Sequence, residues 1–239
     1  LALEPEPACL LETTAETIEW FREDAWSTRA LTVLAALTGL PVSECIGRLR
    51  RHLGVVFDIC HQSVQFEDIG QSLRDLQAAG VPVFKLQAAA ALRVPEVTEE
   101  AVAALETFTD TIYLSQTTER REDGTLRRFL HLADAITAWR ADPTGGAAAA
   151  GGAQGHREWR THFHLPIFLD DLDGLGTTRS GISAALEVHA ETPVSDHLEI
   201  ETYTWDVLPD RFKDGDIVDY VARELDWIGS ELEAVRARR

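Results

Sequence analysis

The stretch Gly54-Val55-Val56-Phe57-Asp58-Ile59-Cys60-His61 decides how the rest of the chain is interpreted. Its β-branched and aromatic residues end in a carboxylate, and an imidazole follows three positions later. This pattern is typical of a buried parallel strand that presents functional groups at its C-terminal end. Four further apolar stretches also end in polar groups, at residues 1–4, 83–87, 159–164 and 197–201. We therefore expect these groups to form one metal site at the mouth of a barrel.

The composition is that of an acidic globular protein. The chain of 239 residues is long enough to bury a sizeable core, and we treat residues 1–239 as one domain. Its 40 acidic and 22 basic residues give a net charge of −18, which repels phosphate backbones and argues against nucleic acid as a partner. No apolar run is long enough for stable membrane insertion. The spacing of the cysteines favours reduced thiols in a cytoplasmic protein: Cys9, Cys45 and Cys60.

Strands and helices alternate along most of the sequence. Thr13-x-x-Glu16 is a capping-box pattern, Thr28 to Leu40 is expected to form a mostly buried helix, and a helix from Asp68 to Ala79 separates two strands. This order predicts an α/β fold, a (β/α) TIM-type barrel with parallel strands. The chain has five strands of the barrel type, lacks methionine and opens inside a strand, whereas a closed barrel has eight strands. We therefore expect a barrel that is incomplete at the N-terminus, in the C-terminal part of a longer protein.

Two stretches interrupt the alternation. Strand-like runs at residues 111–118 and 126–132 flank Glu122-Asp123-Gly124, and Asp-Gly between such runs is a strong hairpin signal. We expect a β-hairpin insertion at about residues 109–132. Residues 143–155 are rich in Gly and Ala and lack larger apolar groups, which predicts a flexible linker on the surface.

Carboxylates and imidazoles at the strand ends are the candidate metal ligands. Carboxylate oxygens suit Mg and Mn, and imidazole nitrogens also suit Fe, Co and Zn. Singly, each residue has a simpler explanation: Glu4 as a solvated loop acid, His61 as a helix cap, and His162 with His164 as an exposed pair. Their order along the chain, each at a strand end, favours a shared divalent ion. The predicted ligand set is Glu4, Asp58, His61, His162, His164 and Glu201.

The strand at residues 83–87 carries different polar groups at its end. Lys85 is a candidate for proton transfer or for binding an anionic substrate group, although a lysine at the barrel rim is the simpler explanation. Arg93 is a further candidate anion contact, with an ordinary surface charge as the alternative. We include Glu6, Gln87 and Arg93 as candidate substrate-binding residues.

The order of these motifs resembles the xylose-isomerase-like TIM-barrel superfamily of sugar isomerases, epimerases and apurinic endonucleases. The shared pattern is Leu-Glu, then Asp-x-x-His, then an x-His-x-His strand followed by Gly174-Leu175-Gly176, then Ile-Glu-Thr. Four spans look more specifically like the EboE-type metabolite traffic proteins: residues 3–7, 57–61, 162–168 and 201–209. The resemblance covers nearly the whole chain and implies metal ligation by the six residues of the predicted set.

The resemblance also implies a function. We expect a metal-dependent protein, similar to sugar-phosphate isomerases and epimerases, that acts on or handles a small hydroxylated metabolite, with Glu4, Glu201 and Lys85 as candidate catalytic residues. The cofactor would be a divalent ion, Mn, Mg, Zn, Co or Fe, and proteins of the same gene cluster are possible partners. A non-catalytic metabolite carrier is the main alternative. A phosphoesterase of the endonuclease kind is disfavoured, since Lys85 or Gln87 stands where those enzymes have a further histidine.

Overall fold

The computed structural model describes residues 1–108, 113–142, 155–201, 213 and 215–238. These residues form a mixed α/β fold with two sheets and nine α-helices. The first sheet is parallel and has the strand order β1 (Ala2–Leu3), β2 (Gly54–Asp58), β3 (Val83–Ala88), β10 (Leu198–Ile200). The second sheet is antiparallel and has the order β6 (Leu126–Phe129), β5 (Thr117–Arg121), β7 (Arg157–Leu165), β4 (Ala90–Val94), β9 (Leu175–Thr177), β8 (Asp171–Leu172).

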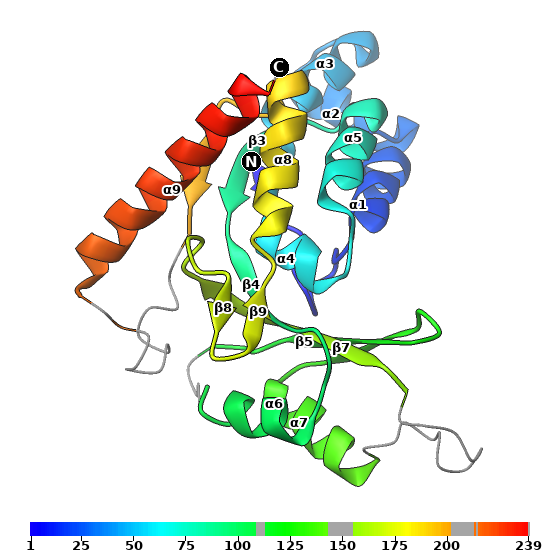
Figure 1. Cartoon of the computed structure of the whole chain (residues 1–239). Coiled ribbons are helices and arrows are strands. Elements are labelled where there is room, and N and C mark those ends of the chain that lie inside the picture. The colour runs from blue at the N-terminus through cyan, green and yellow to red at the C-terminus, as the bar shows by residue number, and fades with distance from the viewer. Residues whose placement is uncertain (109–112, 143–154, 202–212, 214, 239) are drawn as a thin grey trace.

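The helices are distributed unequally between the two sheets (Figure 1). Most surround the parallel sheet, whereas α6 and α7 cover the far side of the second sheet. The helical segments are α1 (Thr14–Trp20), a π-helical turn (Phe21–Ala25), α2 (Thr28–Thr38), α3 (Val42–His52), α4 (Ile59–Val64), α5 (Ile69–Ala79), α6 (Glu99–Leu105), α7 (Leu132–Ala141), α8 (Ser180–Glu191) and α9 (Ile217–Ala237).

The α/β class is confirmed, but the strand pairing differs from the expected barrel. No closed barrel forms within the residues that the structure describes. The expectation that the strand carrying His162 and His164 runs parallel to the others is wrong, because β7 pairs antiparallel with β4 and β5. The cause lies at Ala89, where the chain leaves β3 and continues as β4 in the second sheet. Strand β10 then pairs directly with β3.

Local signals for helices were largely reliable. The capping box of Thr13 and Glu16 is formed, and α5 begins at its cap Asp68 and ends at Gly80, whose φ is 70°. The expectation of a mostly buried helix at Thr28 to Leu40 is wrong, because α2 contains no buried residue. Its apolar residues surround the helix, and only one side of it packs, against α3 and the π-helical turn.

The two interrupting stretches have different outcomes. A hairpin turns at Gly124 as the sequence indicates, but its first strand is β5, which begins only at Thr117. The expected linker at residues 143–155 lies outside the described residues except for Gly155. Across the described chain no single helix is long and apolar enough to cross a membrane; α2 and α3 meet that criterion only as a pair bent by 97°.

Strand β7 separates two environments, because successive side chains of a strand point to opposite faces. Trp159, Phe163 and Leu165 pack with α6 and α7 in an apolar core. The even-numbered residues of β7 are on the other face, toward α4 and the parallel sheet. All four are polar: Glu158, Arg160, His162 and His164. This polar face of β7 positions the sites described next.

Candidate metal centre

The centre begins at the junction of β2 and α4. Asp58 ends the strand and caps the helix, since its Oδ1 accepts a hydrogen bond from the backbone N–H of His61 at 3.1 Å. The strand expected to continue to His61 therefore stops at Asp58, because α4 begins at Ile59. This cap places the His61 ring over the carboxylate, with Nε2 3.8 Å from Asp58 Oδ2.

Three imidazole rings meet at this junction. The Nε2 atom of His162 lies 3.1 Å from Nε2 of His61 and 3.0 Å from Nε2 of His164. All three side chains are buried, so the alternative of an exposed pair at His162 and His164 is wrong. Two of these rings come from β7 and one from α4, which explains why residues 101 positions apart in sequence touch.

Hydrogen bonds at the outer ring nitrogens determine the tautomers. The Nδ1 atoms of His61 and His164 face the carbonyl oxygens of Pro5 and Glu201, at 3.1 and 3.2 Å. His162 Nδ1 faces Gln116 Oε1 at 2.9 Å; the amide nitrogen of Gln116 donates to Pro7 O, which leaves Oε1 as the acceptor. Each Nδ1 therefore carries the proton, and the three Nε2 lone pairs point toward one another.

Converging lone pairs at this distance repel one another, and a cation between them would relieve that repulsion. Burial, reinforced by His61, lowers the pKa of His162 well below its ordinary value, and burial also lowers the pKa of His164. A proton is therefore a poor occupant at neutral pH. Zn–N bonds of about 2.0–2.1 Å in a tetrahedral site place the nitrogens about 3.3 Å apart, a few tenths of an ångström more than here. The three imidazoles fit a divalent metal ion.

The Asp58 carboxylate completes the donor set. Its Oδ2 atom is buried, lies 3.9 Å from His164 Nε2 and has no hydrogen-bond partner while the neighbouring carboxyl groups are ionised; only a protonated Glu201 could donate to the Asp58 carboxylate. A buried carboxylate oxygen without a donor is costly, and a metal ion bound between Asp58, His61 and His164 would remove that cost. Three nitrogens and one oxygen favour Zn, Fe or Co, with Mn next, over Mg.

Three further carboxylates surround the imidazoles on the more open side. The distances from a carboxylate oxygen to the nearest Nδ1 are 3.8 Å for Glu4 and His61, 3.8 Å for Glu6 and His162, and 3.7 Å for Glu201 and His164. Glu4, Asp58 and Glu201 are also close enough to hold an ion together. Burial and the charge of Asp58 raise the pKa of Glu201 to about 8. Burial also raises the pKa of Glu4, although His61 opposes the shift.

The structure divides the remaining candidates. Lys85 forms an ion pair with Glu199 of β10, and the hydrogen bond to that carboxylate raises the pKa of Lys85. Gln87 is buried; its amide nitrogen donates to Glu201 Oε2, while its Oε1 has no hydrogen-bond partner. Arg93 does not join this group, because its Nε donates to Glu158 at 2.8 Å in a different cavity.

Sequence reasoning missed two residues of the centre. Gln116 orients His162, and it was unrecognisable because only the pairing of β5 with β7 brings the two residues together. Cys60 was interpreted only as a reduced thiol. It is completely buried and lies close enough to His162 and His164 to be a third donor.

Comparisons of the chain with protein-family models, with curated proteins and with solved structures found no match. The resemblance to xylose-isomerase-like barrels and to EboE-type proteins therefore stays a prediction. The case for a site rests on the convergence of three imidazoles and one unpaired carboxylate oxygen in the interior of the fold.

Proposed function

We propose that this chain is a metal-dependent isomerase or epimerase that acts on a small hydroxylated, sugar-like metabolite. The observation that supports this most directly is the convergence of the His61, His162 and His164 Nε2 atoms beside the unpaired Oδ2 of Asp58. A bound divalent ion would polarise the oxygens of such a substrate. The same residues would leave one side of the ion open toward the surrounding carboxylates.

The parallel sheet supports the proposed likeness to xylose-isomerase-like barrels. Four strands are parallel and adjacent in the order β1-β2-β3-β10, and Glu4, Asp58, Gln87 and Glu201 lie at or just beyond their C-terminal ends. Active sites of (β/α) barrels are built at that end of the strands. EboE-type metabolite traffic remains our family proposal on the sequence resemblance, with partner proteins and a cytoplasmic location as further predictions.

Glu201 is the best candidate for proton transfer. Its pKa of about 8, raised by burial and by Asp58, leaves the carboxyl group able to give or take a proton near neutral pH. Glu4, whose pKa is also raised, belongs with Asp58 and Glu201 to the same group of carboxylates. A carbon-bound proton and a hydroxyl proton on neighbouring substrate atoms could then be handled by two different carboxyl groups.

Two further side chains would orient the substrate. Gln87 holds Glu201 through its amide nitrogen and leaves its buried Oε1 as an acceptor for a donor that the described residues do not supply. A substrate hydroxyl is such a donor. Lys85, which forms an ion pair with Glu199, also contributes positive charge next to Glu4.

Metal analysis tests the foundation of this proposal. Protein purified without chelator should contain about one to two divalent ions per chain. Asp58→Ala and Glu201→Ala should lower that content, whereas Asp75→Ala, which changes an acid on the exposed face of α5 (Ile69–Ala79), should not. Wild-type metal content in both site variants would mean that the site is misassigned.

Isotope exchange separates catalysis from carriage. In deuterium oxide, an isomerase or epimerase incorporates solvent deuterium into the carbon skeleton of a bound ketose or polyol, and Glu201→Gln should slow this at least about tenfold. Metabolite binding without any incorporation would favour the carrier. Cleavage of abasic DNA that depends on two or three ions per chain would instead indicate a phosphoesterase.

A further inference from the structure

A second polar cavity lies on the other side of α4 from the metal centre. It has a volume of about 200 Å³ and is lined by residues from α4, α5, β4, β7 and the start of α8. His61 and Ser63 are two positions apart in α4, so their side chains point roughly 200° apart around the helix. None of the predicted metal ligands lines this cavity.

Two arginines, Arg93 and Arg160, line one wall of the cavity and belong to a larger cluster around Glu158. Arg93, Arg120 and Arg160 all donate to the buried carboxylate of Glu158, at 2.8, 2.6 and 3.0 Å. Three guanidinium groups around one carboxylate leave two positive charges uncompensated. This concentration is notable in a chain whose net charge is −18.

The guanidinium groups keep donors available. Arg93 uses only its Nε atom, and Arg160 uses Nε on Glu158 and one terminal nitrogen on the carbonyl oxygen of Ser63 at 2.8 Å. Both terminal nitrogens of Arg93 and one of Arg160 therefore have no hydrogen bond to the described residues. A planar pair of such donors matches the geometry of a carboxylate or phosphate group.

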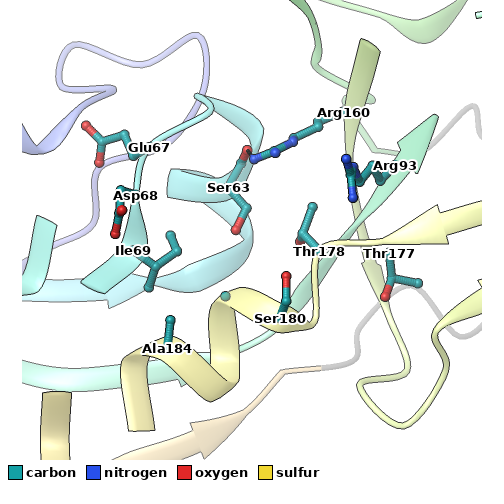
Figure 2. Close-up of a pocket in the computed structure, with 11 residues that line it drawn as sticks. Ser63, Glu67, Asp68, Ile69, Arg93, Arg160, Thr177, Thr178, Ser180 and Ala184 are labelled. Atoms are coloured by element: carbon teal, nitrogen blue, oxygen red, sulfur yellow. Dashed lines mark hydrogen bonds between the residues drawn. The ribbon is translucent and has the colours of Figure 1, made fainter. Parts of the chain in front are cut away.

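Hydroxyl groups face the same space (Figure 2). Ser63 is 2% exposed, yet its Oγ makes no hydrogen bond with the described chain and points into the cavity, toward Ser180. The Thr178 hydroxyl accepts a bond from the Ala91 N–H at 2.8 Å, so its own hydrogen remains available. A hydroxyl on a buried residue that opens into a cavity without a partner in the chain is available to a bound polar group.

Helix α8 adds positive electrostatic potential to the cavity from the side opposite the arginines. It begins at Ser180, has no side-chain cap, and has no acidic residue in its first turn. Its positive end is therefore not neutralised locally. Gly181 permits the close approach of this helix, because a Cβ atom there would lie 3.0 Å from Ile69 Cγ1 and 3.2 Å from Ser63 Oγ.

The acidic lining residues are already engaged. Glu67 accepts hydrogen bonds from Thr14 and Ser72, and Asp68 caps α5 through the N–H of Gln71. Figure 2 shows both carboxylates at the end of the cavity away from the arginines. The charge near the free hydroxyls is therefore set by Arg93 and Arg160.

We propose that this cavity binds a phosphate group, in a site separate from the metal centre. Its volume is below the roughly 300–1,000 Å³ of pockets that enclose a whole drug-sized ligand, so it fits a phosphate group rather than an entire metabolite. The bound phosphate would contact the free guanidinium nitrogens of Arg93 and Arg160 and the hydroxyls of Ser63, Thr178 and Ser180. The group belongs either to inorganic phosphate or to a phosphorylated metabolite.

Calorimetric titration of the purified protein with inorganic phosphate tests the proposal. Binding should saturate at one phosphate per chain, Arg93→Gln should weaken it at least about tenfold, and Ser63→Ala about threefold. Arg127→Gln makes the same charge change on the exposed strand β6 and should leave the affinity within about twofold. Absence of saturable binding, or equal losses in Arg93→Gln and Arg127→Gln, would overturn the proposal.

Two further arms locate the bound phosphate and identify its source. After chelator treatment and dialysis the affinity for phosphate should persist, because no cavity residue is a predicted metal ligand. If the chelator abolishes phosphate binding and Arg93→Gln does not weaken it, phosphate binds at the metal centre and the proposal is overturned. If Arg93→Gln does not fold, as judged by circular dichroism, Ser63→Ala decides the outcome alone. Glycerol 3-phosphate binding about tenfold tighter than phosphate would identify a phosphorylated metabolite, and equal affinity would identify the free ion.

Discussion

Two clusters of ionisable residues lie on the same face of β7, and they solve the problem of buried charge in opposite ways. At one end, the arginines around Glu158 supply more positive charge than the carboxylate needs. At the other end, the imidazoles and Asp58 supply only electron pairs and a negative charge. The first cluster has guanidinium donors to spare and suits an anion, whereas the second has converging electron pairs and suits a cation.

Two glutamates show the same contrast. Burial alone would raise the pKa of Glu158, but hydrogen bonds and charges from Arg93 and Arg160 lower it overall. Burial and the neighbouring Asp58 together raise the pKa of Glu201 to about 8, so Asp58 adds to the effect of burial instead of opposing it. Structural ion pairs lower the pKa of a carboxyl group, whereas functional sites tolerate unfavourable neighbours. The difference suits the arginine cluster to an anion and the imidazole cluster to a cation.

Removing Glu158 should cause the largest loss of stability. Glu158→Ala would leave three guanidinium groups facing one another without a counter-charge, and the free energy of unfolding should fall by about 3 kcal/mol. Urea denaturation measures the change. The control is Glu187→Ala, which breaks the exposed pair with Arg238 and should cost less than about 0.5 kcal/mol. Similar losses in both variants would mean that the arginine cluster is not a structural ion-pair network.

Removing His162 should lower metal affinity strongly while changing the stability of the metal-free protein little. His162→Ala deletes the central imidazole, and metal affinity should fall at least about 100-fold, since even partners of ligands contribute about 10–100-fold. The stability of the metal-free protein should change little or rise, because converging lone pairs are removed. His52→Ala, at the exposed end of α3, is the control for both measurements. A metal-free variant that is strongly destabilised would show that the imidazoles serve the core instead.

The sequence located the members of the histidine cluster better than their arrangement. Asp58 and the x-His-x-His pair were recognisable because polar groups that end or alternate within apolar strands must find partners. The direction of β7 was not recognisable, because polar and apolar residues alternate in the same way in parallel and antiparallel strands. The pairing depends instead on Ala89, where the chain passes from one sheet to the other. Arg93 illustrates the limit: its charge was evident, but only the register opposite Arg160 places it in a second cavity.

Two other errors have a common physical origin. The apolar content of α2 predicted burial, but composition does not reveal whether a partner surface is available. Gln116 escaped notice because its role depends on a contact 46 positions away in sequence. Local rules such as caps, turns and alternation thus predicted elements, whereas contacts between distant elements determined which polar residues share a site.

Asp58→Asn should separate binding from stability more finely. The substitution keeps the helix cap and removes a buried charge whose Oδ2 has no hydrogen-bond partner. The metal-free protein should gain about 1 kcal/mol in the free energy of unfolding, while metal affinity falls. Asp68→Asn changes the equivalent cap of α5, away from any imidazole, and should leave stability within about 0.5 kcal/mol. Loss of stability in Asp58→Asn would indicate that the carboxylate is already satisfied without an ion.

The pH dependence of stability gives the smallest and most specific test. In the metal-free folded protein the pKa of Glu201 is about 8, above its ordinary value of 4.5, so the folded state holds an extra proton between these pH values. The stabilising contribution of the protonated group is therefore lost as pH rises toward 8. The lowered pKa values of His162 and His164 act in the other direction, but only below about pH 6.5.

The informative window is therefore pH 6.5 to 9, where both imidazoles are already neutral. Unfolding free energies of the metal-free protein should decline with pH across this range, and Glu201→Gln should flatten the decline because the amide cannot ionise. Glu233→Gln, on the exposed side of α9, should leave the slope unchanged. Equal slopes in all three proteins would show that Glu201 ionises freely beside Asp58. The cluster would then be a solvated group of acids, and the contrast with the arginine cluster would no longer distinguish a cation site from an anion site.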